Sequence, residues 1–221
     1  MLTDIEFVHS SSNLRALTNL LNEWKALVKS YHKTTKEDVC WIYNERATLS
    51  VLAGAAWRLG WIALEEYSTE KLAPSESEGP LKANGRCDLW LSHGKRSFAI
   101  EAKQSWQGIG RQVKSQNKWA KRKYTAAFKD AGRLIRAEAD SRLAMLFIAP
   151  SFPAREIENT GAAGATALIN DWLETLPRDF KQIGAMAYIF PKETRCFDLN
   201  GRIYPGVVLL VRQRLKREQR R

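Results

Sequence analysis

The amino-acid sequence predicts a mixed α/β fold, with a central sheet covered by helices. Segments whose apolar residues recur at helical spacing alternate with short, largely apolar segments that are typical of strands. Two of these strand segments are joined by the short turn SHGK, which indicates a hairpin. A long amphipathic helix and a further apolar strand follow the hairpin, and this order of elements indicates a mixed sheet.

Helices are expected at residues 11–31, from about residue 36 or 44 to residue 58, at 117–139 and at 165–175. The first follows serines that can cap a helix, and the second stops before a glycine that can end one. Strands are expected at residues 61–67, 87–91, 97–103, 143–149, 183–190 and 207–211. Residues 72–85 are rich in Pro, Ser, Gly and Asn, so they are expected to form a loop.

The formal charge of +11 is concentrated in two segments. Residues 111–142 hold ten Lys and Arg against three acidic residues, and residues 207–221 hold six against one. This distribution indicates a polyanionic partner, more readily nucleic acid than an acidic membrane surface. One face of the helix at 117–139 carries the side chains expected to contact phosphates, namely Lys118, Arg122, Lys129, Arg133 and Arg136. The alternative is a charged face that is only solvated.

The cysteines and the lack of an apolar run long enough to span a membrane indicate the cellular compartment. The three cysteines are far apart and form no CxxC pair, which predicts neither a disulfide framework nor a zinc site. The N-terminus lacks a basic segment followed by a long apolar one, and no apolar run approaches the length of a membrane span. We therefore expect a soluble, cytoplasmic protein without a membrane partner.

Charged residues interrupt both strands of the predicted hairpin, in the stretch GRCDLWLSHGKRSFAIEAK. Glu101 and Lys103 share one face of their strand, and pairing through the turn would bring Asp88 to the same end of the hairpin. Glu45 lies four and seven positions before apolar residues of its helix, so its side chain is expected on the inward face. Two carboxylates at close range suit Mg²⁺ or Mn²⁺ between them. Such an ion can polarise a phosphodiester and activate a water, while Lys103 orients that water or stabilises the developing charge.

These residues resemble the motif of the PD-(D/E)XK nuclease superfamily, whose members share the restriction-endonuclease-like fold. Asp88 matches the first acid, Glu101 and Lys103 in "EAK" match the acid-x-Lys, and Glu45 in "YNERATLSVLA" matches the helix glutamate. The resemblance covers residues 40–150, and it departs from the motif at Cys87, which replaces the proline. It implies a mixed central sheet flanked by helices, with an N-terminal helix and a C-terminal strand extension.

The resemblance also implies a domain plan and a function. The chain is expected to be a single nuclease-like domain, with a helical extension at 1–35, a catalytic core at 40–150, a helix and strands completing the sheet at 151–211, and a basic tail at 212–221. The implied function is a Mg²⁺- or Mn²⁺-dependent endonuclease that cleaves DNA in restriction, phage defence or DNA processing. Asp88 and Glu101 would be the metal ligands, Lys103 the catalytic lysine and Glu45 an auxiliary acid. A homodimer or partner protein subunits are compatible with this function.

Other interpretations of the same residues remain. Asp88, Glu101 and Lys103 would form a cross-strand ion pair if they lay on a solvated sheet face. Glu45 would then only favour the dipole of its helix. At the level of function, the alternatives are a non-catalytic nucleic-acid-binding subunit of a larger complex and a nuclease that cleaves RNA. Trp106 and Trp119 flank the charged motif and could stack on a splayed base, but tryptophans are more often core residues, so the core role is the one expected.

Overall fold

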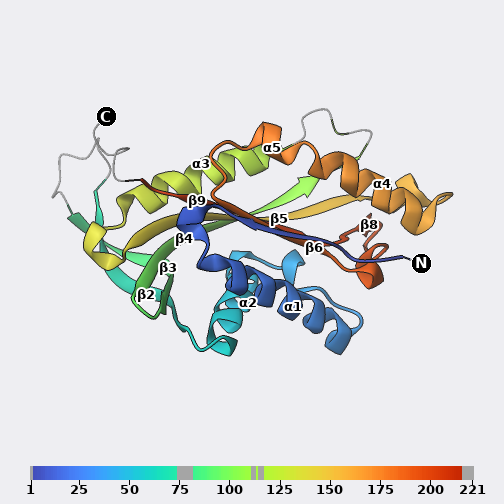
Figure 1. Ribbon diagram of the computed structural model, residues 1–221. Coiled ribbons are helices and arrows are strands. Elements are labelled where there is room, and N and C mark those ends of the chain that lie inside the picture. The colour runs from blue at the N-terminus through green and yellow to red at the C-terminus, as the bar shows by residue number, and fades with distance from the viewer. Residues whose placement is uncertain (1, 74–81, 111–112, 114–116, 216–221) are drawn as a thin grey trace.

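The computed structural model describes residues 2–73, 82–110, 113 and 117–215. Helices lie on both faces of one sheet (Figure 1): α1 (Leu17–Thr35) and α2 (Glu45–Arg58) on one face, and α3 (Lys118–Arg133), α4 (Gly161–Leu173) and α5 (Leu176–Asp179) on the other. Short 3₁₀ segments occur at Ser12–Leu14, Cys40–Ile42, Arg136–Glu138, Ala154–Ile157 and Lys192–Thr194. The predicted mixed α/β architecture, with a sheet flanked by helices, is confirmed.

The strands are β1 (Ile5–Ser10), β2 (Ile62–Leu72), β3 (Lys82–His93), β4 (Arg96–Gly108), β5 (Ser141–Pro153), β6 (Ala185–Phe190), β7 (Asp198–Leu199), β8 (Arg202–Ile203) and β9 (Val207–Gln213). Their order in the sheet is β1-β6-β9-β5-β4-β3-β2, and β7 and β8 form a small hairpin that attaches to β5. β4 and β5 pair in parallel, with α3 in the connection between them, whereas the other pairings are antiparallel. The C-terminal strand β9 lies between β5 and β6, so the strand expected at 207–211 forms part of the sheet and occupies an interior position in it.

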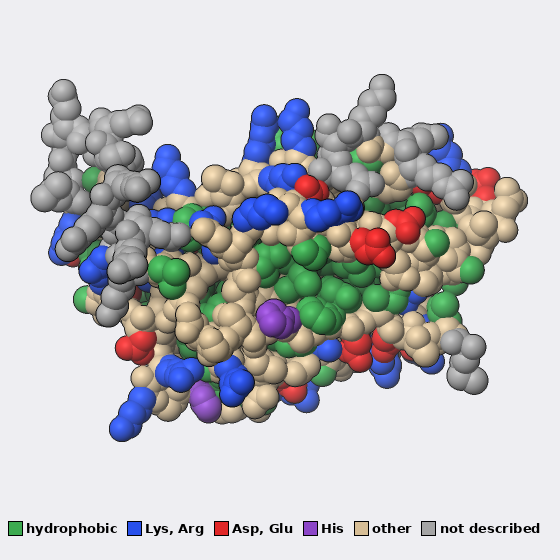
Figure 2. All heavy atoms as spheres, turned by 45° about the horizontal axis from the view of Figure 1, so that its top comes forward, with side chains coloured by type: hydrophobic (Ala, Val, Ile, Leu, Met, Phe, Trp, Pro, Cys, Tyr) green, Lys and Arg blue, Asp and Glu red, His purple; other side chains and the backbone are tan. Residues whose placement is uncertain are grey.

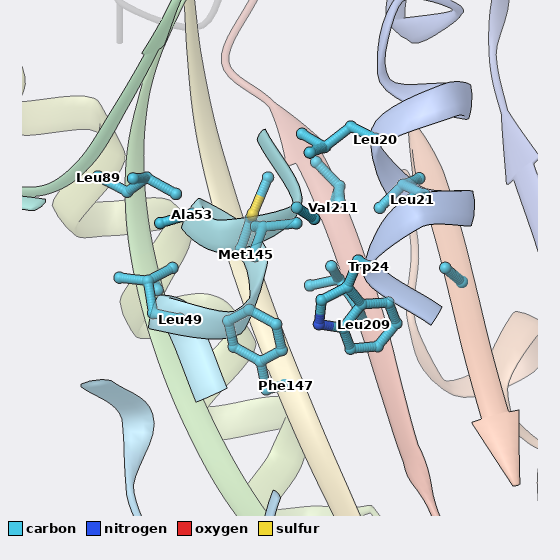
Figure 3. Close-up of a cluster of buried hydrophobic side chains, with 14 of the residues drawn as sticks. Leu20, Leu21, Trp24, Leu49, Ala53, Leu89, Met145, Phe147, Leu209 and Val211 are labelled. Atoms are coloured by element: carbon cyan, nitrogen blue, oxygen red, sulfur yellow. The ribbon is translucent and has the colours of Figure 1, made fainter. Parts of the chain in front are cut away.

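The larger core lies between α1, α2 and the sheet (Figure 3). The stripe of leucines and Trp24 on α1 meets Leu49 and Ala53 of α2, Leu89 of β3, and residues of β5 and β9. Burial of each such leucine contributes about 1.5–3 kcal/mol relative to leaving it exposed. A second core on the opposite face joins α3, α4 and α5 to β5, β6 and β9. The helical spacing of apolar residues in the sequence therefore predicted which faces are buried.

Local signals also explain how α2 and the central hairpin begin. Asn44 is the N-cap of α2, and its Oδ1 accepts a hydrogen bond of 2.9 Å from the backbone N–H of Ala47. In the SHGK turn, Gly94 has a φ of +59°, a conformation that glycine adopts readily and that two-residue hairpin turns require. The predicted hairpin is confirmed, but both of its strands are longer than expected.

Several boundaries differ from the prediction, and β2, expected at 61–67, extends to Leu72. Residues 82–85 of the expected loop at 72–85 belong to β3, while residues 74–81 lie outside the described residues, as do residues 216–221 of the expected basic tail. β1 was not expected, because as an edge strand it contributes only Ile5 to one core and Val8 to the other, which leaves little alternation to detect.

α3 is shorter than the helix that was expected at 117–139. α3 ends at Arg133, because Leu134 is extended (ψ 138°) and fully buried beside Cys87 and Ala99. The guanidinium of Arg142 donates a hydrogen bond of 2.8 Å to the carbonyl of Leu134. Long-range packing and capping therefore end this helix before its amphipathic pattern does.

Candidate active site

The site forms where β3 and β4 separate. Their ladder runs from His93–Arg96 to Leu89–Ile100, whereas β4 continues beside β5 as far as Gly108. Beyond Ile100, no strand among the described residues pairs with this side of β4, which we call the open edge of β4.

Two carboxylates take over hydrogen-bonding positions along the open edge. Asp88 Oδ2 accepts a hydrogen bond of 2.8 Å from the N–H of Ala102. Glu45 Oε2 accepts one of 3.2 Å from the N–H of Gln104. Backbone N–H groups in a partly buried strand need an acceptor, so these bonds hold both carboxylates beside β4.

The side chain of Gln104 fixes α2 against β4 at the same place. Its Oε1 accepts a hydrogen bond of 2.7 Å from the Thr48 hydroxyl, and its Nε2 donates one of 3.1 Å to the carbonyl of Trp41. Gln104 is almost fully buried, so its amide requires these partners. The result is a defined position for the first turn of α2 and therefore for Glu45.

Lys103 lies among three carboxylates. Its Nζ is 3.9 Å from Glu45 Oε1, 4.0 Å from Asp88 Oδ2 and 3.6 Å from Asp130 Oδ2. Burial alone would lower the pKa of Lys103, but the charges of these carboxylates outweigh it and raise the pKa above its ordinary value. The side chain is therefore an ammonium group at neutral pH.

Glu101 is buried and has its own cationic partner. Its carboxylate Oε1 lies 2.7 Å from Lys71 Nζ, and the two side chains are 3% and 13% exposed. Burial raises the pKa of Glu101 to about 7, the charge of Asp88 adds to the rise, and Lys71 and Lys103 oppose it. Burial likewise raises the pKa of Glu45. The charge of Lys103 opposes this rise, and the charge of Asp88 adds to it. Burial, more than the repulsion from Asp88, therefore disfavours the charged forms of both glutamates.

The structure brings together the four residues singled out in the sequence: Glu45, Asp88, Glu101 and Lys103. Lys71 and Asp130 belong to the same cluster but were not predicted. The only sequence signal for Asp130 is that it is the one acidic residue within α3. Lys71 had no signal, because its neighbourhood looked like the start of a loop and its partner Glu101 is 30 positions away.

The donor set fits a hard divalent cation. Asp88 and Glu101 offer carboxylate oxygens, and the rise that the Asp88 charge causes in the pKa of Glu101 is the repulsion that such a cation would relieve. Among the described residues, no group of three or more His, Cys, Asp or Glu side chains is placed to hold a metal ion. Mg²⁺ commonly binds to one or two carboxylates, with waters and substrate oxygens completing its coordination. Asp88 and Glu101 therefore fit as ligands of Mg²⁺ or Mn²⁺.

A stripe of α3 faces this cluster. Asp130 contacts Lys103, and Lys123 acts on the pKa of Glu45 through its charge. Residues 119, 123 and 130 are spaced by four and seven positions, so Trp119 lies on the same face of the helix. We call Trp119, Lys123 and Asp130 the site-facing stripe.

The basic face predicted for this helix lies about a quarter of a turn from the site-facing stripe. Lys118, Arg122, Lys129 and Arg136 are exposed, although Arg136 follows the end of α3. Arg133 is half-buried, and its Nε donates a hydrogen bond of 3.0 Å to the carbonyl of Leu72. Lys and Arg side chains gather over the part of the surface where α3 lies (Figure 2). The basic face is thus largely exposed beside the site, and Arg133 also supports the fold.

Trp106 and Trp119 are not core residues, contrary to expectation. They are 49% and 62% exposed. The indole Nε1 of Trp106 donates a hydrogen bond of 3.1 Å to the carbonyl of Ile42, just before α2. The guanidinium of Arg122 lies 4.8 Å from the centroid of the Trp119 ring.

Comparison of the chain with protein-family models, with curated proteins and with solved structures gave no match. None of the described helices is both long enough and apolar enough to cross a membrane.

Proposed function

We propose that this protein is a metal-dependent nuclease that hydrolyses phosphodiester bonds in DNA, with the restriction-endonuclease-like fold of the PD-(D/E)XK superfamily. The observation that carries the proposal is the cluster at the open edge of β4, where Lys103 Nζ lies within 4.0 Å of Glu45, Asp88 and Asp130. An ion pair on a solvated face would not need this arrangement, because Glu101 is buried and Asp88 and Glu45 also bond to the backbone of β4.

The roles of the side chains follow from their charge states. The ammonium of Lys103 can donate hydrogen bonds to a phosphate oxygen and stabilise the negative charge that develops there. It is protonated at neutral pH, so it does not serve as a general base. Glu45, whose pKa is raised, is suited to accept a proton from an attacking water.

Asp88 and Glu101 would hold Mg²⁺ or Mn²⁺. When bound, this ion supplies charge neutralisation and lowers the pKa of a coordinated water. Asp130 does not face the phosphate in this scheme. It positions Lys103 and keeps it charged, as the distance of 3.6 Å indicates.

Cleavage of circular double-stranded and single-stranded DNA in the presence of Mg²⁺ or Mn²⁺ tests the proposal. Lys103→Ala and Asp88→Asn are expected to lower the cleavage rate by about 100-fold or more, the size of effect seen when one group that stabilises a transition state is removed. Lys95→Ala is the matched control, since Lys95 is an exposed lysine in the turn of the same hairpin, and it should cleave like wild type.

Equal cleavage by wild type, Lys103→Ala and Asp88→Asn would refute the proposed site. Salt-sensitive DNA binding without cleavage under any of these conditions would instead identify a non-catalytic binding subunit. Parallel reactions with RNA of the same sequence distinguish the two nuclease alternatives, and the proposal requires faster cleavage of DNA.

A further inference from the structure

Two of the exposed tryptophans, Trp106 and Trp119, lie along one path that leads away from Lys103. Trp106 is on β4, three residues beyond Lys103 and thus about 10 Å further along the strand. Trp119 is on the site-facing stripe of α3, eleven residues and so about 16 Å from Asp130. The chain leaves the end of β4 and returns at the start of α3, so both tryptophans lie toward the same end of the two elements (Figure 1).

The open edge of β4 runs between these two side chains. Even-numbered residues of β4, such as Ile100 and Ala102, face the core formed with α1 and α2, whereas Glu101 and Lys103 face α3. Trp106 therefore lies on the α2 side of the edge and Trp119 on the α3 side. Each indole extends the row of functional groups on its own side of the edge, after Glu45 of α2 and Gln104 of β4 on one side and after Asp130 and Lys123 of α3 on the other.

The surroundings of both rings suit a nucleotide. The Trp106 ring is oriented by its hydrogen bond to Ile42, and Trp119 has the cationic Arg122 beside it, with Lys118 and Lys123 exposed nearby. Aromatic rings beside a positively charged path are the usual means of binding single-stranded nucleic acid, since bases stack on the rings while lysine and arginine neutralise phosphates. In a duplex, the bases are stacked on each other and are not accessible to these rings.

We infer that Trp106 and Trp119 stack on unpaired bases next to the phosphate held at Lys103, so that the preferred substrate is single-stranded DNA or the single-stranded part of a partly paired DNA. This inference rests on the proposed function for its account of cleavage, but the binding step stands on the two tryptophans alone.

Binding in EDTA tests the inference without cleavage. A fluorescently labelled single-stranded oligonucleotide and the corresponding blunt duplex are titrated with wild type, Trp119→Ala, Trp119→Phe and Trp106→Ala. Wild type should bind the single strand more tightly than the duplex. Each alanine variant should weaken binding of the single strand by about tenfold, with little change for the duplex, because loss of one stacking platform affects only unpaired bases. Trp119→Phe should restore most of the affinity, which a merely structural defect would not allow.

Trp57→Ala is the matched control. Trp57 is 55% exposed in the last turn of α2, twelve residues from Glu45, and its replacement should leave both affinities unchanged. The inference fails if wild type binds the duplex as tightly as the single strand, or if Trp119→Ala binds the single strand as tightly as Trp57→Ala does.

The outcomes separate this inference from the proposed function. Cleavage that depends on Lys103 together with unchanged binding by Trp119→Ala would overturn only the stacking inference. Single-strand binding that depends on the tryptophans, without cleavage, would support stacking and overturn the nuclease proposal.

Discussion

Lys71 is the residue that balances the charge of Glu101 in the candidate site. Its ammonium lies 2.7 Å from the carboxylate of Glu101, and both groups are largely removed from water. Lys71 therefore already supplies a positive charge to the carboxylate that is proposed to bind the metal ion. Two cations would compete for one buried carboxylate, and the charge of Lys71 should weaken metal binding by Glu101.

Replacement of Lys71 by methionine tests this competition. At pH 8, Lys71→Met should lower the free energy of unfolding by about 3 kcal/mol, because it leaves a buried charge without its partner. Mg²⁺ should raise the melting temperature of Lys71→Met more than that of wild type, since the ion replaces the lost positive charge. Thermal unfolding with and without Mg²⁺ measures both effects.

Lys82→Met provides the control, because Lys82 of β3 pairs with Glu70, the neighbour of Lys71 on β2, but both of these side chains are more than half exposed. Its stability should change by less than about 1 kcal/mol and its response to Mg²⁺ should not change. An equal response to Mg²⁺ in wild type and Lys71→Met would contradict the competition.

The start of α3 depends on contacts with α4 and α5. Asn117 is fully buried, its Nδ2 donates a hydrogen bond of 2.7 Å to Asp179 Oδ2, and its Oδ1 accepts one of 2.8 Å from the indole of Trp172. Lys121 Nζ lies 2.6 Å from Asp179 Oδ1. Since Trp119 lies between Asn117 and Lys121, this network also sets the position of the proposed stacking platform.

The stability contributed by Asp179 should depend on pH. Burial alone would raise the pKa of Asp179, but the hydrogen bonds from Lys121 and Asn117 outweigh it and lower the pKa below its ordinary value of 3.8. A lowered pKa in the folded state means that the contribution is present above pH 3.8 and is lost as the pH falls through the folded-state pKa.

Asp179→Ala should therefore lower the free energy of unfolding by about 1–2 kcal/mol at pH 7, with the difference from wild type narrowing below pH 3.8. Urea unfolding at a series of pH values measures it. Asp171→Ala, which removes an exposed aspartate of α4, should stay within about 0.5 kcal/mol of wild type throughout. A difference for Asp179→Ala that does not change with pH would rule out the ionised form as its cause.

The charge of the whole molecule is distributed unevenly over its surface. Of the net +11, much lies on and around α3, on the face of the sheet opposite α1 and α2. Lys118, Arg122 and Lys129 are exposed about a quarter of a turn from the site-facing stripe. In the proposed function, they would contact phosphates on either side of the one bound at Lys103.

The salt dependence of DNA binding tests this distribution. Lys118→Ala and Lys129→Ala should each reduce the slope of log K against log salt by about 0.7 for a single strand, because each removes one phosphate contact. Lys33→Ala should leave the slope unchanged, since Lys33 is exposed on α1, on the other face of the sheet. Equal slopes for all three variants would show that the basic face does not contact the DNA.

Most elements and the central hairpin could be predicted from local sequence patterns. Apolar spacing predicted α1, α2 and most strands, because core-facing residues must recur with the period of the element that carries them. The turn at Gly94 then set the register that brings Asp88 beside Glu101 and Lys103. These three residues were found because charges in apolar strands are costly unless they have a use or a partner, and Glu45 was found because its spacing places it on the inward face of its helix. Their proposed roles in catalysis stay predictions.

The remaining features depend on contacts between distant parts of the chain. The position of β9 inside the sheet, the end of α3 at Arg133, and the contacts of Lys71 with Glu101 and of Asp130 with Lys103 all join segments distant in sequence. The exposure of Trp106 and Trp119 belongs to the same group, since the spacing of a tryptophan does not reveal whether another element covers it. Local sequence patterns indicate which face of an element is buried. Packing across the whole chain determines which other element covers that face.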